Sequence, residues 1–206
     1  LGSSLPWFLM ARHARFDLPL AVMVSVGLWC CWWAAEGGAE RRWWYLGAAG
    51  AMGLGMLTKG PIALVLTGVP FLLYVALTGR LVALKRVPWV ACVALLLAVA
   101  APWYVACERA NPGYLAFFFG HENAWRLTRE VPVRQPWWHT IAFLLGGLLP
   151  WSLCVPGALC RAWRSVRHGG GAEARLLLLS CLLVGVTIAV YIPPPVKFVQ
   201  YIMPGL

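Results

Sequence analysis

A few ionisable side chains stand out in a chain that is otherwise largely apolar. Asp17 directly precedes an apolar run, and Lys59 is the only ionisable side chain between Arg42 and Arg80 apart from two tyrosines. Cations beside a carboxylate can neutralise an anionic group, while the carboxylate can take a proton or ligate a metal. Such side chains would bind an anionic substrate if folding brought them together. Four other residues are candidates for the same site: His121, Glu122, Arg126 and Lys197.

The composition places these residues in a membrane protein. Apolar residues make up 61% of the 206 positions and charged residues only 12%, where about 25% charged is usual in soluble domains. Several apolar runs approach the roughly 20 residues that a helix needs to cross a bilayer. We therefore expect an all-α, polytopic transmembrane bundle without a nucleic-acid partner. The predicted crossings are 16–35, 43–58, 61–78, 87–106, 139–160 and 176–192, with an outward loop over 107–138.

Helix geometry predicts where Lys59 lies. It follows Arg42 by 17 residues and precedes Arg80 by 21, which correspond to about 25 and 31 Å of helix. Both lengths are close to one bilayer thickness. If the two arginines lie at one membrane face, Lys59 lies at the other, at the tip of a helical hairpin that turns at Gly60 and Pro61.

Alternating crossings sort the loops onto two sides. One side receives the compact basic loops 36–42, 78–86 and 161–175, with nine cations. The other receives eight cations, most of the acidic residues and the long 107–138 segment. These totals do not orient the chain, but compact basic loops are typical of a cytoplasmic face. Cations that stay on the outward side against this bias suggest a function there.

Each candidate also has a purely structural interpretation. Asp17 could cap a helix N-terminus, and Lys59 could be a cation that reaches the interface from a helix end. Arg126 could pair with Glu122 one helical turn earlier. His121 and Glu122 together supply at most two metal ligands, so a divalent metal stays open but is not required.

Lys197, which follows a Pro-rich break, could simply mark the water boundary. Taken together, however, these residues fall on one face by the count of crossings. Cations and a carboxylate at a membrane surface suit an anionic, lipid-attached substrate. A polyprenyl phosphate fits, because its phosphate would meet the cations and its tail would lie between apolar helices.

Several motifs, in order along the chain, resemble one known family. They are "RFDLPLAV", "GLGMLTKGPIALVL", "APWYVACERANPGYLAFFFGHENAWRL", "PWWHTIAFLLGGLLPW" and "KFVQYIMPGL". They are similar to those of the bacterial polyprenyl-phosphate-sugar glycosyltransferases, which include the aminoarabinose transferases of lipid A and relatives of the dolichyl-phosphate-mannose protein mannosyltransferases. The resemblance covers about residues 11–206.

The resemblance implies a C-type glycosyltransferase (GT-C) membrane domain, with a site on the extracytoplasmic face of a bacterial inner membrane. A polyprenyl-phosphate sugar would be the donor, and lipid A, a glycan or a protein the acceptor. Asp17 matches an acidic catalytic position and Lys59 matches a lysine that faces the phosphate. The same resemblance assigns substrate contacts to His121, Glu122, Arg126, Lys197 and Tyr201.

The resemblance also implies that the chain is an internal fragment. The acidic residue expected to be the principal base falls before Leu1, so we expect the fragment alone to be inactive. An alternative function is a membrane transporter or lipid flippase, which would place ionisable residues near mid-membrane and show internal repeats. A structural membrane subunit is a third interpretation, in which the outward cations are merely solvated.

Overall fold

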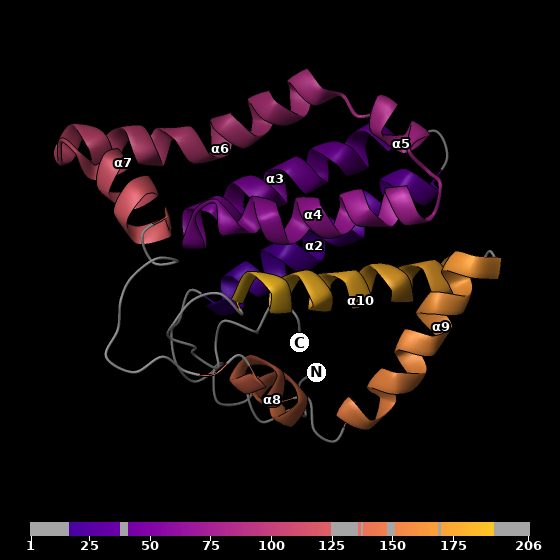
Figure 1. Cartoon of the computed structure of the whole chain (residues 1–206). Coiled ribbons are helices and arrows are strands. Elements are labelled where there is room, and N and C mark those ends of the chain that lie inside the picture. Colours follow the sequence, from indigo (N-terminus) through magenta and orange to yellow (C-terminus); the bar gives the residue numbers. More distant parts are fainter. Residues whose placement is uncertain are drawn as a thin grey trace.

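The computed structural model describes residues 17–37, 41–124, 136, 138–147, 151–168 and 170–191. Within these ranges every regular element is helical (Figure 1). The α-helices are α2 (Asp17–Glu36), α3 (Arg41–Lys59), α4 (Ile62–Leu77), α5 (Val82–Lys85), α6 (Trp89–Ala110), α7 (Tyr114–Ala116), α8 (Trp138–Gly147), α9 (Val155–His168) and α10 (Ala172–Tyr191). A π-helix, η1 (Phe117–Ala124), follows α7, and a 3-10 helix, η3 (Trp151–Cys154), precedes α9.

Three of the described helices are long and apolar enough to cross a membrane: α2, α6 and α10. They have 20, 22 and 20 residues, and 20 residues of helix rise about 30 Å, the thickness of a bilayer's hydrocarbon core. α4 is a shorter apolar helix of 16 residues. The chain is therefore an all-α, polytopic membrane bundle, and the predicted fold class is confirmed.

α3 and α4 form the tight hairpin that the sequence predicts. The amide of Gly60 donates a 2.9 Å hydrogen bond to the carbonyl of Met56, which closes the last turn of α3. Gly60 has a φ of 79°, a left-handed conformation that favours glycine because it has no Cβ. Pro61 then precedes α4, which begins at Ile62. These local residues place Lys59 at the tip of the hairpin.

Small residues let α3 approach its neighbours closely. A Cβ added at Gly47 would lie 3.2 Å from the sulfur of Cys30 in α2, and one at Gly55 would lie 2.8 Å from the Cβ of Ala63 in α4. A Cβ added at Gly53 would lie 3.0 Å from the Cβ of Val99 in α6. Small residues of this kind let helices pack closely in membrane proteins. The structure shows that this helix packs on three neighbours at once.

The predicted crossing 139–160 contains three described helical elements. α8 and the pair formed by η3 and α9 lie in this region as separate helices, and Figure 1 shows α8 and α9 running in different directions. Apolar length alone predicted one continuous helix. Residues 148–150, which join α8 to η3, lie outside the described residues.

The predicted outward loop 107–138 begins with helical structure. α6 continues to Ala110, and α7 and η1 follow after a turn at Gly113. The carboxylate of Glu108 accepts hydrogen bonds from the amides of Gly113 at 2.9 Å and Leu115 at 2.8 Å. It thereby satisfies donors that the start of α7 leaves without helical acceptors. Glu108 thus has a local structural role in this turn.

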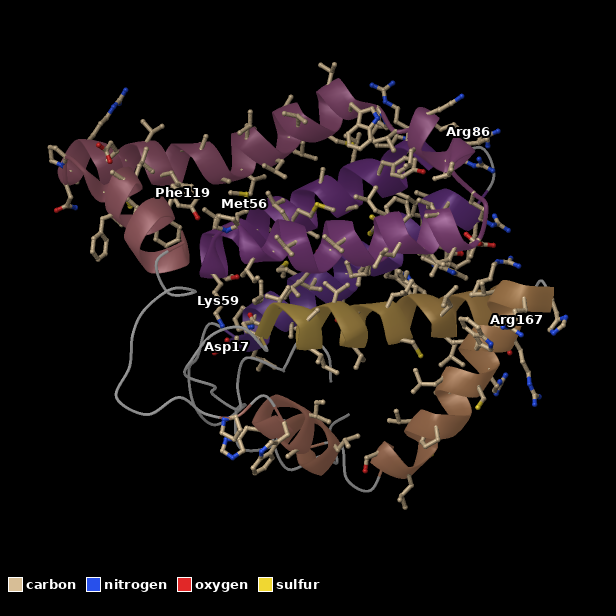
Figure 2. All side chains as sticks on the ribbon, in the orientation of Figure 1. Asp17, Met56, Lys59, Arg86, Phe119 and Arg167 are labelled. Atoms are coloured by element: carbon tan, nitrogen blue, oxygen red, sulfur yellow. The ribbon has the colours of Figure 1, made fainter. Side chains whose placement is uncertain are left out.

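The bundle has a polar cluster at each end. α2 and α10 run in opposite directions along it, so the end of α2 lies beside the start of α10 (Figure 1). At one end, Glu36 accepts a 2.9 Å hydrogen bond from Nε of Arg175 and lies 3.3 Å from a guanidinium nitrogen of Arg80. These three residues come from the three basic segments that the sequence predicts on one side, and they meet at this end of the bundle. The opposite end carries Asp17 and Lys59 (Figure 2).

Candidate active site at the Asp17 and Lys59 end

Asp17 and Lys59 form an ion pair although 42 residues separate them in the sequence. Asp17 is the first residue of α2 and Lys59 is the last residue of α3. Because these helices are antiparallel neighbours, the start of one lies beside the end of the other. Nζ of Lys59 donates to Oδ1 of Asp17, and the two labelled side chains point toward one another in Figure 2.

Burial makes this ion pair stronger than one in open water. The side chain of Asp17 is 11% exposed and that of Lys59 is 22% exposed. A fully solvated pair contributes about 0 to 1 kcal/mol, whereas a pair in surroundings of lower dielectric attracts more strongly. Removing one partner would leave the other as a largely buried charge without compensation.

Helix dipoles stabilise the same two charges. The N-terminal end of a helix carries partial positive charge and favours Asp17, while the C-terminal end carries partial negative charge and favours Lys59. The positions of both residues at helix ends are thus also compatible with their structural interpretations. The ammonium of Lys59, held by the Asp17 carboxylate and partly exposed, can still exchange that carboxylate for an anionic ligand.

Tyr191 is a third member of this end that the sequence reasoning missed. It is the last residue of α10, and Nζ of Lys59 lies 5.9 Å from the centroid of its ring. Tyr191 is buried, so the ring is held in place beside the ammonium. A cation near an aromatic face is attracted by the ring's negative electrostatic potential. The only signal in the sequence was a tyrosine at the end of an apolar run.

An aromatic cluster of Tyr104, Tyr114, Phe118 and Phe119 lies at the same end. The hydroxyl of Tyr104 donates a 2.8 Å hydrogen bond to the carbonyl of Met56, three residues before Lys59. The ring centroid of Tyr104 is 5.6 Å from those of both phenylalanines, and Tyr114 stacks on Phe118 at 5.7 Å. Figure 2 shows Phe119 and Met56 at the end of the bundle that carries Lys59. This cluster therefore joins α6, α7 and η1 to the last turn of α3.

Of the other predicted site residues, two lie in a described helix and three lie outside the described part of the chain. His121 and Glu122 belong to η1, directly after the phenylalanines of the aromatic cluster. Arg126, Lys197 and Tyr201 lie outside the described residues. Their roles therefore stay predictions. Within the described part of the chain, no three His, Cys, Asp or Glu side chains are grouped so that they could hold a metal ion.

Comparison with known proteins identifies the relatives of this chain. It is 34% identical over 161 residues to the undecaprenyl phosphate-alpha-4-amino-4-deoxy-L-arabinose arabinosyl transferase 1 of Pseudomonas fluorescens, covering 76% of this chain and 26% of that protein. The corresponding transferase of Pseudomonas aeruginosa is 35% identical over 157 residues, covering 76% of this chain and 27% of its own length. The chain thus spans about a quarter of the length of these curated relatives.

Solved structures show the same architecture. The crystal structure of ArnT from Cupriavidus metallidurans bound to undecaprenyl phosphate matches 96% of this chain and 36% of its own, with a TM-score of 0.82 and 25% identity. The apo structure of the same protein matches 97% of this chain and 35% of its own, with a TM-score of 0.79 and 24% identity.

The family model described as dolichyl-phosphate-mannose-protein mannosyltransferase matches residues 1–105. These residues include Asp17, Lys59 and the hairpin that positions them. The predicted resemblance is confirmed. With just over half of its length matched by this model, the chain belongs to the dolichyl-phosphate-mannose-protein mannosyltransferase family.

Proposed function

We propose that this chain is part of an integral-membrane glycosyltransferase that moves a sugar from a polyprenyl phosphate to an acceptor. The observation that carries this proposal is the buried ion pair of Asp17 and Lys59 at one end of an apolar helical bundle. The relatives support it, because their names specify an arabinosyl transferase that uses an undecaprenyl phosphate sugar. A pentose derivative is accordingly the first donor sugar to test, and lipid A is the first acceptor.

In this proposal Lys59 binds the phosphate of the donor. The hydroxyl of the acceptor attacks the anomeric carbon with inversion, the bond to the phosphate oxygen breaks, and the polyprenyl phosphate departs with the bonding electrons. A carboxylate takes the proton of the acceptor hydroxyl. Negative charge grows on the phosphate as the bond breaks, so an ammonium at that position lowers the barrier.

Asp17 is proposed as the carboxylate that holds Lys59. Its oxygen already accepts from the ammonium, which favours positioning of Lys59 over removal of a proton from the acceptor. His121, Glu122, Arg126, Lys197 and Tyr201 remain proposed substrate contacts. The resemblance implies that the principal base is an acidic residue that precedes Leu1 in the full-length protein.

The site is proposed to face the periplasm, or the exterior, from a bacterial inner membrane. The opposite end carries the compact basic loops, which are typical of a cytoplasmic face. Asp17, Glu36 and Lys59 are all terminal residues of their helices. This placement favours a transferase over a transporter or flippase, which would hold ionisable groups near mid-membrane.

A transfer assay of the full-length protein tests the proposal. The purified protein would be reconstituted in vesicles and supplied with a panel of polyprenyl-phosphate sugars and with lipid A, a glycan or a peptide as acceptor. The proposal expects sugar transfer and release of polyprenyl phosphate with at least one pair. Movement of lipid between leaflets without sugar transfer from any donor would support the flippase instead.

A further inference from the structure

Glu36 lies at the centre of a polar cluster at the opposite end of the bundle from Lys59. The Glu36 cluster consists of Glu36, Tyr74, Arg80 and Arg175. The hydroxyl of Tyr74 donates a 2.5 Å hydrogen bond to Oε1 of Glu36. Arg175 donates to both carboxylate oxygens, from Nε at 2.9 Å and from a terminal nitrogen. Arg80 adds an ion pair at 3.3 Å.

This cluster ties three helices together at one level. Glu36 is the last residue of α2, Tyr74 lies near the end of α4, and Arg175 lies in the first turn of α10. The Glu36 side chain is 9% exposed and that of Arg175 is 21% exposed. A two-point contact between a guanidinium and a carboxylate is directional, so it constrains both the rotation of α10 and its position along the helix axis.

α10 requires such a constraint because its apolar residues do not provide one. They occupy every face of the helix, so burial alone does not select a single rotation. Ion pairs of this kind add little net stability, and their best-documented benefit is to specify one arrangement among several. The Glu36 cluster therefore selects the register of α10 against α2 and α4.

The register of α10 decides where Tyr191 lies. A helix is stiff, and one residue of slip along its axis moves its end by about 1.5 Å. Tyr191 is the terminal residue of α10, and its ring lies 5.9 Å from Nζ of Lys59. Two polar contacts thus fix the two ends of α10, one at Glu36 and the other at Lys59.

We propose that the Glu36 cluster positions Tyr191 against Lys59 by fixing the register of α10, so that Glu36 and Arg175 are positioning residues for the phosphate-binding end. This inference rests on the proposed function. It predicts that a substitution at Glu36 or Arg175 alters the surroundings of Tyr191, although Arg175 and Tyr191 are separated by about 24 Å of helix.

The first experiment does not depend on activity. A fluorotyrosine would be installed at position 191 of the full-length protein, and its fluorine resonance would be recorded for variants. Lys59→Met calibrates the shift that follows loss of the ammonium. We expect Arg175→Met and Glu36→Gln to move or broaden the resonance, while Arg86→Met, an exposed cation at the same end as Arg175, leaves it unchanged. An unmoved resonance in both cluster variants, with Lys59→Met shifted, would overturn the proposal.

The second experiment is a double-mutant cycle on transfer by the full-length protein. Arg175→Met is expected to lower kcat by about tenfold, because small misplacements at a reacting centre are costly. Independent sites this far apart give additive effects. If Arg175 acts through Tyr191, adding Arg175→Met to Tyr191→Leu lowers kcat less than twofold further. Full additivity would overturn the proposal, and Arg175→Lys should restore part of the rate.

Transfer by the unmodified protein separates the two hypotheses. If it transfers sugar and its variants behave additively, the positioning role fails and the glycosyltransferase proposal survives. If it transfers no sugar from any donor while the fluorine resonance responds to Arg175→Met, the coupling between the ends of α10 holds and the proposed function fails. The thermal unfolding midpoint of each variant identifies any that have lost the fold.

Discussion

Lys59 and Asp17 end and begin two antiparallel helices, and their side chains meet as a largely buried ion pair. The carboxylate of Asp17 therefore holds the ammonium of Lys59 at this end of the bundle. A ligand with a phosphate group would compete with Asp17 for the same ammonium.

Lys59→Met in the full-length protein is expected to lower kcat for sugar transfer by about 100- to 1000-fold, the usual effect of removing a donor that stabilises developing negative charge. Lys59→Arg should retain part of the rate because it keeps the charge. Steady-state assays with a polyprenyl-phosphate sugar provide the measurement. Arg86→Met is the matched control at the other end of the bundle, and a rate near normal in Lys59→Met would contradict the assigned role.

Asp17→Asn is expected to slow transfer by way of Lys59. The substitution keeps the size of the side chain but removes the negative charge that holds the ammonium. If this is its only role, Asp17→Asn combined with Lys59→Met is no slower than Lys59→Met alone, because residues acting as one unit are not additive. A double variant slowed by the full product of the single effects would instead indicate that Asp17 takes a proton itself.

Tyr104→Phe should weaken the attachment of α6 to the end of α3. The hydroxyl donates to the carbonyl of Met56, which also accepts the amide of Gly60. Loss of one such bond costs about 1 kcal/mol, so the thermal unfolding midpoint in detergent should fall. Tyr114→Phe is the control, since its ring remains able to stack on Phe118. Equal midpoints in the two variants would argue against a stabilising role for the Tyr104 hydroxyl.

Gly55→Ala should destabilise the bundle although alanine favours helix. The added Cβ would lie 2.8 Å from that of Ala63, a separation that forces α3 and α4 apart, and overpacking of this kind costs about 1 to 3 kcal/mol. Gly68→Ala in α4 is the control, because no atom lies within 4 Å of its added Cβ. We expect the unfolding midpoint to fall for the first variant and to hold or rise for the second. The opposite order would refute this packing.

Local features allowed much of the bundle to be predicted from the sequence. Apolar runs of sufficient length indicated membrane helices, and Gly60 and Pro61 indicated a turn that delivers Lys59 to one end. Apolar length predicts one crossing over 139–160, a range in which the structure describes α8, η3 and α9 and does not describe residues 148–150. The pairing of Glu36 with Arg175 could not be predicted from the sequence, because the two residues lie 139 positions apart in the chain.

Hydropathy, helix length and turn residues act over short distances, so these local features suffice to predict a helical membrane protein with Lys59 at a helix end. The fold was needed to show which side chains meet: Lys59 with Asp17 and Tyr191, and Glu36 with Arg175. The physical reason is that α2 and α10 are apolar on every face. Their rotation and register leave no periodic trace in the sequence and are selected by packing and by polar contacts at the ends of the bundle.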